Sequence, residues 1–118
     1  MTVGDLVDIR SHGDVIVAEL SGEIDLSNAR LIGTQASAAM RNDAAGLVLD
    51  LTGTTYLDSS GVHLVFDLAE RLTSRQQRLV LVVPEGSRIR RVLDLVNVQA
   101  VVPVATEQQQ AVTAARGG

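Results

Sequence analysis

Residues 47–65 read LVLDLTGTTYLDSSGVHLV, a stretch that joins an apolar strand to the start of a helix. Apolar residues continue through Leu47–Leu51, where a half-exposed strand would alternate, so we expect a strand covered on both faces. Residues 52–55 predict a loop after it. Helical spacing from Ser59 predicts a helix that ends within residues 73–76. Its expected buried stripe is Val62, Val65, Phe66, Ala69 and Leu72.

Strands and helices alternate in the rest of the chain. The other expected strands are Leu6–Ile9, Val15–Leu20, Leu79–Val83 and Val101–Val104, and a turn-forming cluster at residues 11–14 separates the first two. The other expected helices run from about Ser27 to Asp43, from a cap at Ser87 through Ile89, Val92, Leu93 and Val96, and from about Glu107 to Ala115. The first of them should bury Leu31, Thr34 or Gln35, Ala38 and Ala39. This order predicts one α/β domain with a mixed, mostly parallel sheet, an N-terminal antiparallel hairpin and about four helices.

Composition narrows the classes of function. The chain has 118 residues, enough for one domain, and no cysteine, which excludes disulfides, thiolate zinc sites and cysteine nucleophiles. A net charge of −4 with 2% aromatic residues argues against direct contact with nucleic acid. All ten basic residues are arginine, so no lysine is present for a P-loop or a Schiff base. Since no signal segment or membrane-spanning run is evident, we expect a cytoplasmic protein without membrane insertion.

The junction at Asp58 and Ser59 is the strongest candidate site. Backbone N–H groups at a helix start lack partners within the helix and carry positive potential, so a phosphate on a hydroxyl there is tolerated. The alternative is that Asp58 and Ser59 only cap the helix and that Ser60 packs or caps beside them. Asp25 has the same alternative, as a cap of the first helix.

Catalytic interpretations of the sequence are weak, and we expect no enzyme activity and no cofactor. His12 and His63 are the only imidazoles, and they lack the spacing of metal ligands. Ser59 lies in Asp-Ser-Ser-Gly instead of the Gly-x-Ser-x-Gly pattern of hydrolases. Glu23, Asp50 and Asp58 suggest a metal cluster, but carboxylates at surfaces and turns are common, and we expect no bound metal ion.

Three segments together carry a family resemblance: GEID at residues 22–25, the apolar strand Leu47–Leu51, and YLDSSGV at residues 56–62. In order and spacing the chain resembles the STAS domain of bacterial anti-sigma factor antagonists, over nearly its whole length. The resemblance implies a STAS domain over residues 3–115, followed by a frayed tail at residues 116–118.

The family resemblance implies a phosphorylation switch. The unphosphorylated antagonist binds an anti-sigma factor, itself a serine kinase with the histidine-kinase-like ATPase fold, and so frees a sigma factor. Phosphorylation of the serine directly after the motif aspartate, Ser59 here, ends the complex, and a serine phosphatase resets it. The implied contact residues for the partner are Asp25, Asp58, Ser59, Ser60, Gly61 and His63. Asp25 is expected to lie close to Ser59 and to help the kinase recognise it.

Two features of the sequence leave the identity of the partner open. His63 departs from the small residue that many relatives have there, and it is either an ordinary helix residue or a contact that selects the kinase. Arg88, Arg90 and Arg91 form a basic cluster that is either a solvated face or a surface that attracts an acidic partner. The alternative function is a cytoplasmic STAS subunit of a lipid-transport ATPase complex; a scaffold in a stress-sensing assembly is a third.

Overall fold

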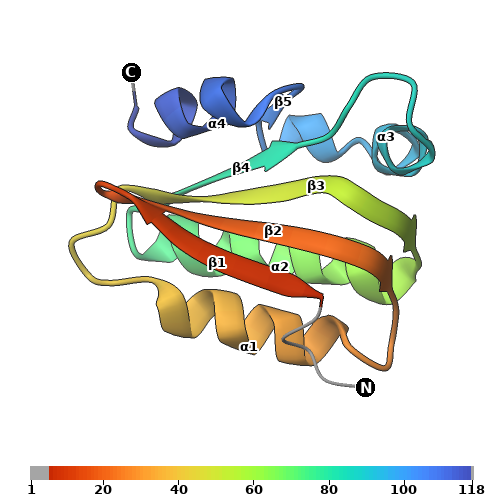
Figure 1. Cartoon of the computed structure of the whole chain (residues 1–118), viewed down its shortest axis with the longest axis horizontal. Coiled ribbons are helices and arrows are strands. Elements are labelled where there is room, and N and C mark those ends of the chain that lie inside the picture. Colours follow the sequence, from red (N-terminus) through yellow and green to blue (C-terminus); the bar gives the residue numbers. More distant parts are fainter. Residues whose placement is uncertain (1–5, 118) are drawn as a thin grey trace.

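A five-stranded mixed sheet forms the centre of the domain, and its strands lie side by side in chain order (Figure 1). The computed structural model describes residues 6–117. The strands are β1 (Val7–His12), β2 (Val15–Ile24), β3 (Gly46–Leu57), β4 (Arg78–Val82) and β5 (Val104–Ala105). The helices are α1 (Ala29–Ala39), α2 (Ser59–Ser74), α3 (Arg88–Leu95) and α4 (Gln108–Ala115), with a short 3-10 helix η2 (Val98–Ala100). Since β1 pairs antiparallel with β2 and the following pairs are parallel, the predicted fold class is confirmed.

The sheet is covered on both faces. Helices α1 and α2 lie below it in the view of Figure 1, and α4 lies above it. Leu47, Leu49 and Leu51 pack into the larger apolar cluster with α1 and α2, whereas Val48 belongs to a smaller cluster with α4. Successive side chains of a strand point to opposite faces, so the apolar residues of β3 contribute to both cores. This confirms the strand predicted at Leu47–Leu51.

The prediction for the loop at residues 52–55 is wrong, because β3 continues through them to Leu57. The neighbouring strand β2 also runs past its predicted end, to Ile24, and pairs with this extension. The register shifts twice along the pair, between Glu19 and Ser21 and between Gly22 and Glu23. Bulges of this kind let a strand continue through Gly and Thr residues that otherwise suggest a turn.

The predicted face of the first helix is also wrong. Helix α1 spans only Ala29–Ala39, and its buried residues are Ala29, Ile32, Gly33 and Ala36. Leu31, Thr34, Gln35 and Ala38 are exposed, and Ala39 is partly buried. An alanine-rich helix offers two apolar stripes of similar strength, and packing against the sheet and α2 selects the one that contains Ile32.

The other helices agree better with the sequence. In α2, Val65, Ala69 and Leu72 are buried, whereas Val62 and Phe66 are partly buried against the core. Ser87 caps α3 by accepting a hydrogen bond from the Arg90 amide at 3.1 Å. Val96, predicted to belong to this helix, follows its last residue and is exposed.

The C-terminal part differs in detail from the prediction. The strand expected at Val101–Val104 begins only at Val104, because η2 and a turn occupy residues 98–102. Helix α4 ends at Ala115, and the side chain of Arg116 pairs with Asp14 at 2.9 Å. The expected domain start at Val3 and the last tail residue, Gly118, lie outside the described residues. No helix within residues 6–117 has the length and apolar character to cross a bilayer.

Candidate functional site

Two neighbouring strand ends bring the motif segments together. Ile24, the last residue of β2, pairs with Leu57, the last residue of β3, in parallel register. The Asp58 amide then donates a hydrogen bond to the Ile24 carbonyl at 3.2 Å. Because β2 and β3 end side by side, the turn that begins at Asp25 lies beside the start of α2.

Asp58 caps helix α2 with its side chain. Its Oδ1 accepts hydrogen bonds from the amides of Ser60, at 2.8 Å, and Gly61, at 3.2 Å. The predicted capping role is therefore confirmed, and two of the N–H groups expected to be open for a phosphate are taken. Ser59 occupies the first position of the helix and its side chain is exposed. Ser59 is thus an exposed residue that directly follows the capping residue Asp58.

Gly61 lies on the buried face of α2. It is buried, and a Cβ atom at this position would lie 2.3 Å from Leu57 Cδ1 and 3.3 Å from Ile24 Cγ2. Only glycine lets α2 begin this close to the ends of β2 and β3. Its contribution to the site is the approach of the helix to the sheet.

Asp25 shapes the turn before α1 without capping that helix. Its Oδ1 accepts from the Ser27 amide at 2.9 Å and from the Ser27 hydroxyl at 2.5 Å, which is the pattern of an Asx turn. Asn28 holds the same turn from inside: its Oδ1 accepts from the Asp25 amide at 3.0 Å, and its Nδ2 donates to the Glu23 carbonyl at 2.9 Å. The role of this buried asparagine was not predicted. The sequence feature that could have indicated it is an amide side chain three residues after Asp25.

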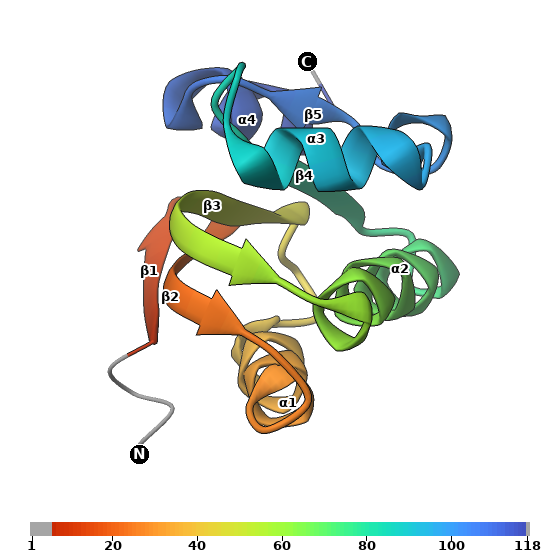
Figure 2. The same ribbon diagram turned by 90° about the vertical axis from the view of Figure 1, so that its right-hand side faces the viewer.

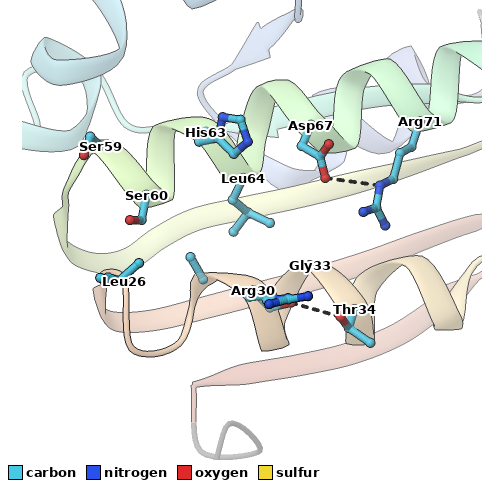
Figure 3. A pocket seen from close by; sticks show the side chains of 11 residues that line it. Leu26, Arg30, Gly33, Thr34, Ser59, Ser60, His63, Leu64, Asp67 and Arg71 are labelled. Atoms are coloured by element: carbon cyan, nitrogen blue, oxygen red, sulfur yellow. Dashed lines mark hydrogen bonds and ion pairs between the residues drawn. The ribbon is translucent and has the colours of Figure 1, made fainter.

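An open groove of about 690 Å³ runs between α1 and α2 and contains the acceptor candidate (Figure 3). Ser59, Ser60 and His63 lie along its α2 side, whereas Asp25, Asp58 and Gly61 do not line it. The rest of the lining was not predicted as part of a site; it consists of Leu26, Ala29, Arg30, Gly33, Thr34, Leu64, Asp67 and Arg71. No local pattern marks these residues, because they meet only when the two helices pack.

The groove has a narrow apolar floor and charged walls. A Cβ atom on Gly33 of α1 would lie 2.8 Å from Leu64 Cδ1 of α2, so the two helices pack closely there. Arg71 and Asp67 form an ion pair at 3.1 Å along the α2 wall. Leu26, which is 81% exposed, lies across the groove from Ser60 (Figure 3). This exposed leucine leaves apolar surface at the Ser59 end of the groove.

Comparison with known proteins assigns the fold to a family. The STAS domain pattern matches residues 7–111, most of the chain. The chain belongs to the STAS domain family. The anti-sigma-F factor antagonist RsfB of Mycobacterium tuberculosis is 28% identical to this STAS domain over 112 residues, covering 95% of this chain and 90% of RsfB.

Solved structures agree with this assignment of the STAS domain. An anti-sigma factor antagonist from Mycobacterium paratuberculosis superposes with a TM-score of 0.82 at 25% identity, covering 93% of this chain and 92% of that one. The anti-sigma factor antagonist SpoIIAA in its unphosphorylated form gives a TM-score of 0.72 at 22% identity, covering 95% and 99% of the two chains, which shows the shared fold.

His63 of this STAS domain is exposed on α2, one helical turn beyond Ser59. Residues four positions apart on a helix lie on the same face, and both of these line the groove. The imidazole therefore lies on the same side of α2 as Ser59.

The carboxylates considered for a metal site have other partners in this STAS domain. Asp50 accepts hydrogen bonds from the Thr52 amide at 2.9 Å, the Thr52 hydroxyl at 2.6 Å and Gln108 Nε2 at 2.8 Å. Asp58 caps α2. In the described part of the chain, no three His, Cys, Asp or Glu residues are placed to hold a metal ion, so Glu23, Asp50 and Asp58 do not form a metal-binding cluster.

Proposed function

We propose that this STAS domain is a cytoplasmic anti-sigma factor antagonist controlled by phosphorylation of Ser59. In this function the unphosphorylated form binds an anti-sigma factor and thereby frees a sigma factor. The anti-sigma factor is a serine kinase with a histidine-kinase-like ATPase fold, and it inactivates the antagonist by phosphorylating it. A serine phosphatase restores the binding form.

The observation that carries the proposal is the position of Ser59. Its side chain is exposed at the first position of α2, directly after the capping aspartate and at the rim of the groove. A kinase can reach this hydroxyl without unfolding the helix. The names of RsfB and of the Mycobacterium paratuberculosis protein as antagonists support the same function.

Local charge suffices to explain the switch. A phosphoserine carries roughly −1.5 to −2 charges at neutral pH, and here it would lie beside the Asp58 carboxylate. The amides of Ser60 and Gly61 already bond to Asp58, so they cannot fully offset the added charge. The Asp25 carboxylate belongs to the adjacent turn and adds to the negative potential. A loss of about 3–4 kcal/mol in binding free energy would weaken the complex several-hundred-fold.

The kinase supplies the remaining chemistry. Ser59 Oγ attacks the γ-phosphorus of ATP held by the partner, ADP leaves, and the hydroxyl proton passes to a base. Magnesium belongs with that ATP, so the antagonist itself needs no metal. The phosphatase then hydrolyses the phosphoserine and restores the hydroxyl.

Affinity capture from an extract of the source organism, with ADP present, tests the proposal. The bait is wild type, Ser59→Asp or Gln109→Glu, and mass spectrometry identifies the retained proteins. Gln109 is exposed near the start of α4, so its variant adds one negative charge away from the site and serves as the control.

We expect wild type and Gln109→Glu to retain a kinase-like anti-sigma factor and Ser59→Asp to release it. Equal retention of a transporter ATPase by all three baits, with no anti-sigma factor, would contradict the proposal. That result would favour the alternative of a subunit in a lipid-transport complex.

A further inference from the structure

The basic cluster of α3 consists of Arg90, which contacts neighbouring residues of the domain, and of Arg88 and Arg91, which are exposed. Arg90 donates to the Val83 carbonyl at 3.1 Å and pairs with Asp94 at 3.5 Å, and its side chain is only 18% exposed. Arg88 and Arg91 are exposed. The ion pairs found among residues 6–117 include Arg90 but neither of these two.

The two outward arginines share a helix face with an exposed leucine. Positions 88, 91 and 95 follow the i, i+3, i+7 spacing, so they lie on one side of α3. That side is opposite Ile89 and Leu93, which are buried in the core. Leu95 is 81% exposed, and Val96 and Val101 just beyond it are 41% and 58% exposed. The outer face of α3, defined here as Arg88, Arg91 and Leu95, is therefore both basic and apolar.

The positive charges of Arg88 and Arg91 are not neutralised by the acidic residue of α3. Asp94, the acidic residue of α3, already pairs with Arg90 and accepts a hydrogen bond from Gln99 at 3.3 Å. The face is thus locally positive in a chain whose net charge is −4. Guanidinium groups are weakly hydrated and bind carboxylates in a bidentate manner, and arginine is enriched at protein interfaces. This chemistry is complementary to a segment that carries carboxylates next to an apolar side chain.

Helix α3 lies at the same end of the sheet as Ser59. Strands β3 and β4 are parallel, so α2 and α3 both begin beyond the carboxyl ends of their strands. Figures 1 and 2 show α3 above the sheet, on the face opposite α1 and α2, near the end of the sheet from which α1 and α2 start. A protein that binds at Ser59 can therefore extend to the outer face of α3.

We propose that the outer face of α3 is a second contact surface for the anti-sigma factor and that it binds an acidic amphipathic segment of that partner. This inference rests on the proposed function. Arg88 and Arg91 attract and pair with the carboxylates of the segment, and Leu95 covers its apolar side chain. The surface is separate from Ser59, so it speeds the encounter, whereas the phosphorylation state of Ser59 controls release.

Stopped-flow kinetics with the purified anti-sigma factor identified by the capture experiment test the inference. Arg88→Glu/Arg91→Glu reverses both charges of the face. The control Arg41→Glu/Arg75→Glu makes the same change of net charge at exposed positions near the other ends of α1 and α2. Leu95→Ser tests the apolar contact. All the changed side chains are exposed, and thermal unfolding verifies that each variant is folded.

We expect Arg88→Glu/Arg91→Glu to lower the association rate constant about tenfold at low salt, with a difference that shrinks as salt increases. Leu95→Ser should raise the dissociation rate constant about threefold, because it removes a contact that forms after the encounter. The control should bind almost as fast as wild type.

Rate constants equal to those of the control would overturn this inference alone. Loss of binding to phosphatidylglycerol vesicles in Arg88→Glu/Arg91→Glu, with unchanged kinetics toward the anti-sigma factor, would also overturn it and indicate a lipid surface instead. Failure of wild type to bind any anti-sigma factor would overturn the proposed function and this inference together.

Discussion

The amide of Asp58 donates a hydrogen bond to the carbonyl oxygen of Ile24 across 3.2 Å. This backbone contact continues the pairing of β2 and β3 for one residue beyond the end of β3. It holds the start of α2 against the turn at Asp25 without using any side chain of the site. Side-chain substitutions at Ser59 or Ser60 should therefore test recognition while this backbone contact stays in place.

Replacement of Ser59 by alanine should abolish phosphorylation by the cognate kinase, because it removes the exposed hydroxyl at the start of α2. Binding of the unphosphorylated protein should persist. Ser60→Ala is the matched control, since Ser60 is less exposed and its amide, not its hydroxyl, contacts Asp58. The measurement is incorporation of phosphate by the purified kinase. Phosphate on Ser59→Ala and none on Ser60→Ala would show that the acceptor has been misassigned.

Replacement of Asp58 by alanine should lower the free energy of unfolding by about 1 kcal/mol, because the amides of Ser60 and Gly61 lose their acceptor. Asp58→Asn keeps an acceptor oxygen and should lose much less. Urea denaturation of wild type and both variants measures the difference. Equal losses for the two substitutions would mean that charge, and not the cap, provides the stability.

Replacement of Gly61 by alanine should lower the free energy of unfolding by about 1–3 kcal/mol, because the new methyl group overlaps Leu57. Glu70→Ala, at an exposed position of the same helix, is the control and should change stability little. Urea denaturation again gives the values. A stable Gly61→Ala protein would show that α2 can move away from the ends of the strands at low cost.

Replacement of Gly33 by alanine should narrow the floor of the groove, since the added Cβ lies 2.8 Å from Leu64 Cδ1. The gain in helix propensity, about 1 kcal/mol, partly offsets the crowding, so the fold should survive. Affinity for the anti-sigma factor should fall if the partner enters the groove, and Gly33→Ala/Leu64→Val should recover part of it. Isothermal titration calorimetry measures both. Unchanged affinity in the single variant would place the partner outside the groove.

Asp14 should make stability depend on acid pH. The hydrogen bond from Arg116 Nε lowers the pKa of Asp14 below its ordinary value of 3.8. A lowered pKa in the folded state stabilises the protein above the unfolded-state value, and this contribution disappears as the pH falls through the folded-state pKa. Asp14→Asn should therefore lower Tm at neutral pH but not near pH 2.

Thermal unfolding between about pH 2 and 7 tests this dependence, with the pH range chosen to span the titration of an aspartate. Asp43→Asn, which changes another exposed carboxylate, is the control. The same Tm difference between wild type and Asp14→Asn at every pH would refute a contribution from this titration.

Local patterns in the sequence determined much of the site. The cap at Asp58 was predictable because its bonds to Ser60 and Gly61 join residues two and three positions apart. The cap at Ser87 was predictable for the same reason. The doubly covered strand Leu47–Leu51 was evident because its composition reflects burial on both faces. In each case the interaction or the burial leaves its mark within a few consecutive residues.

Only the tertiary structure decided which stripe of α1 is buried, how far β3 extends and where the groove lies. Ile32 is buried and Leu31 exposed because of packing against elements that are distant in sequence. The approach of Gly33 to Leu64 joins two helices separated by a strand, and neither residue marks it alone. The capping hydrogen bonds of Asp58 and Ser87 span one helical turn and are encoded in the local sequence. Grooves and buried faces instead depend on which distant surfaces pack together.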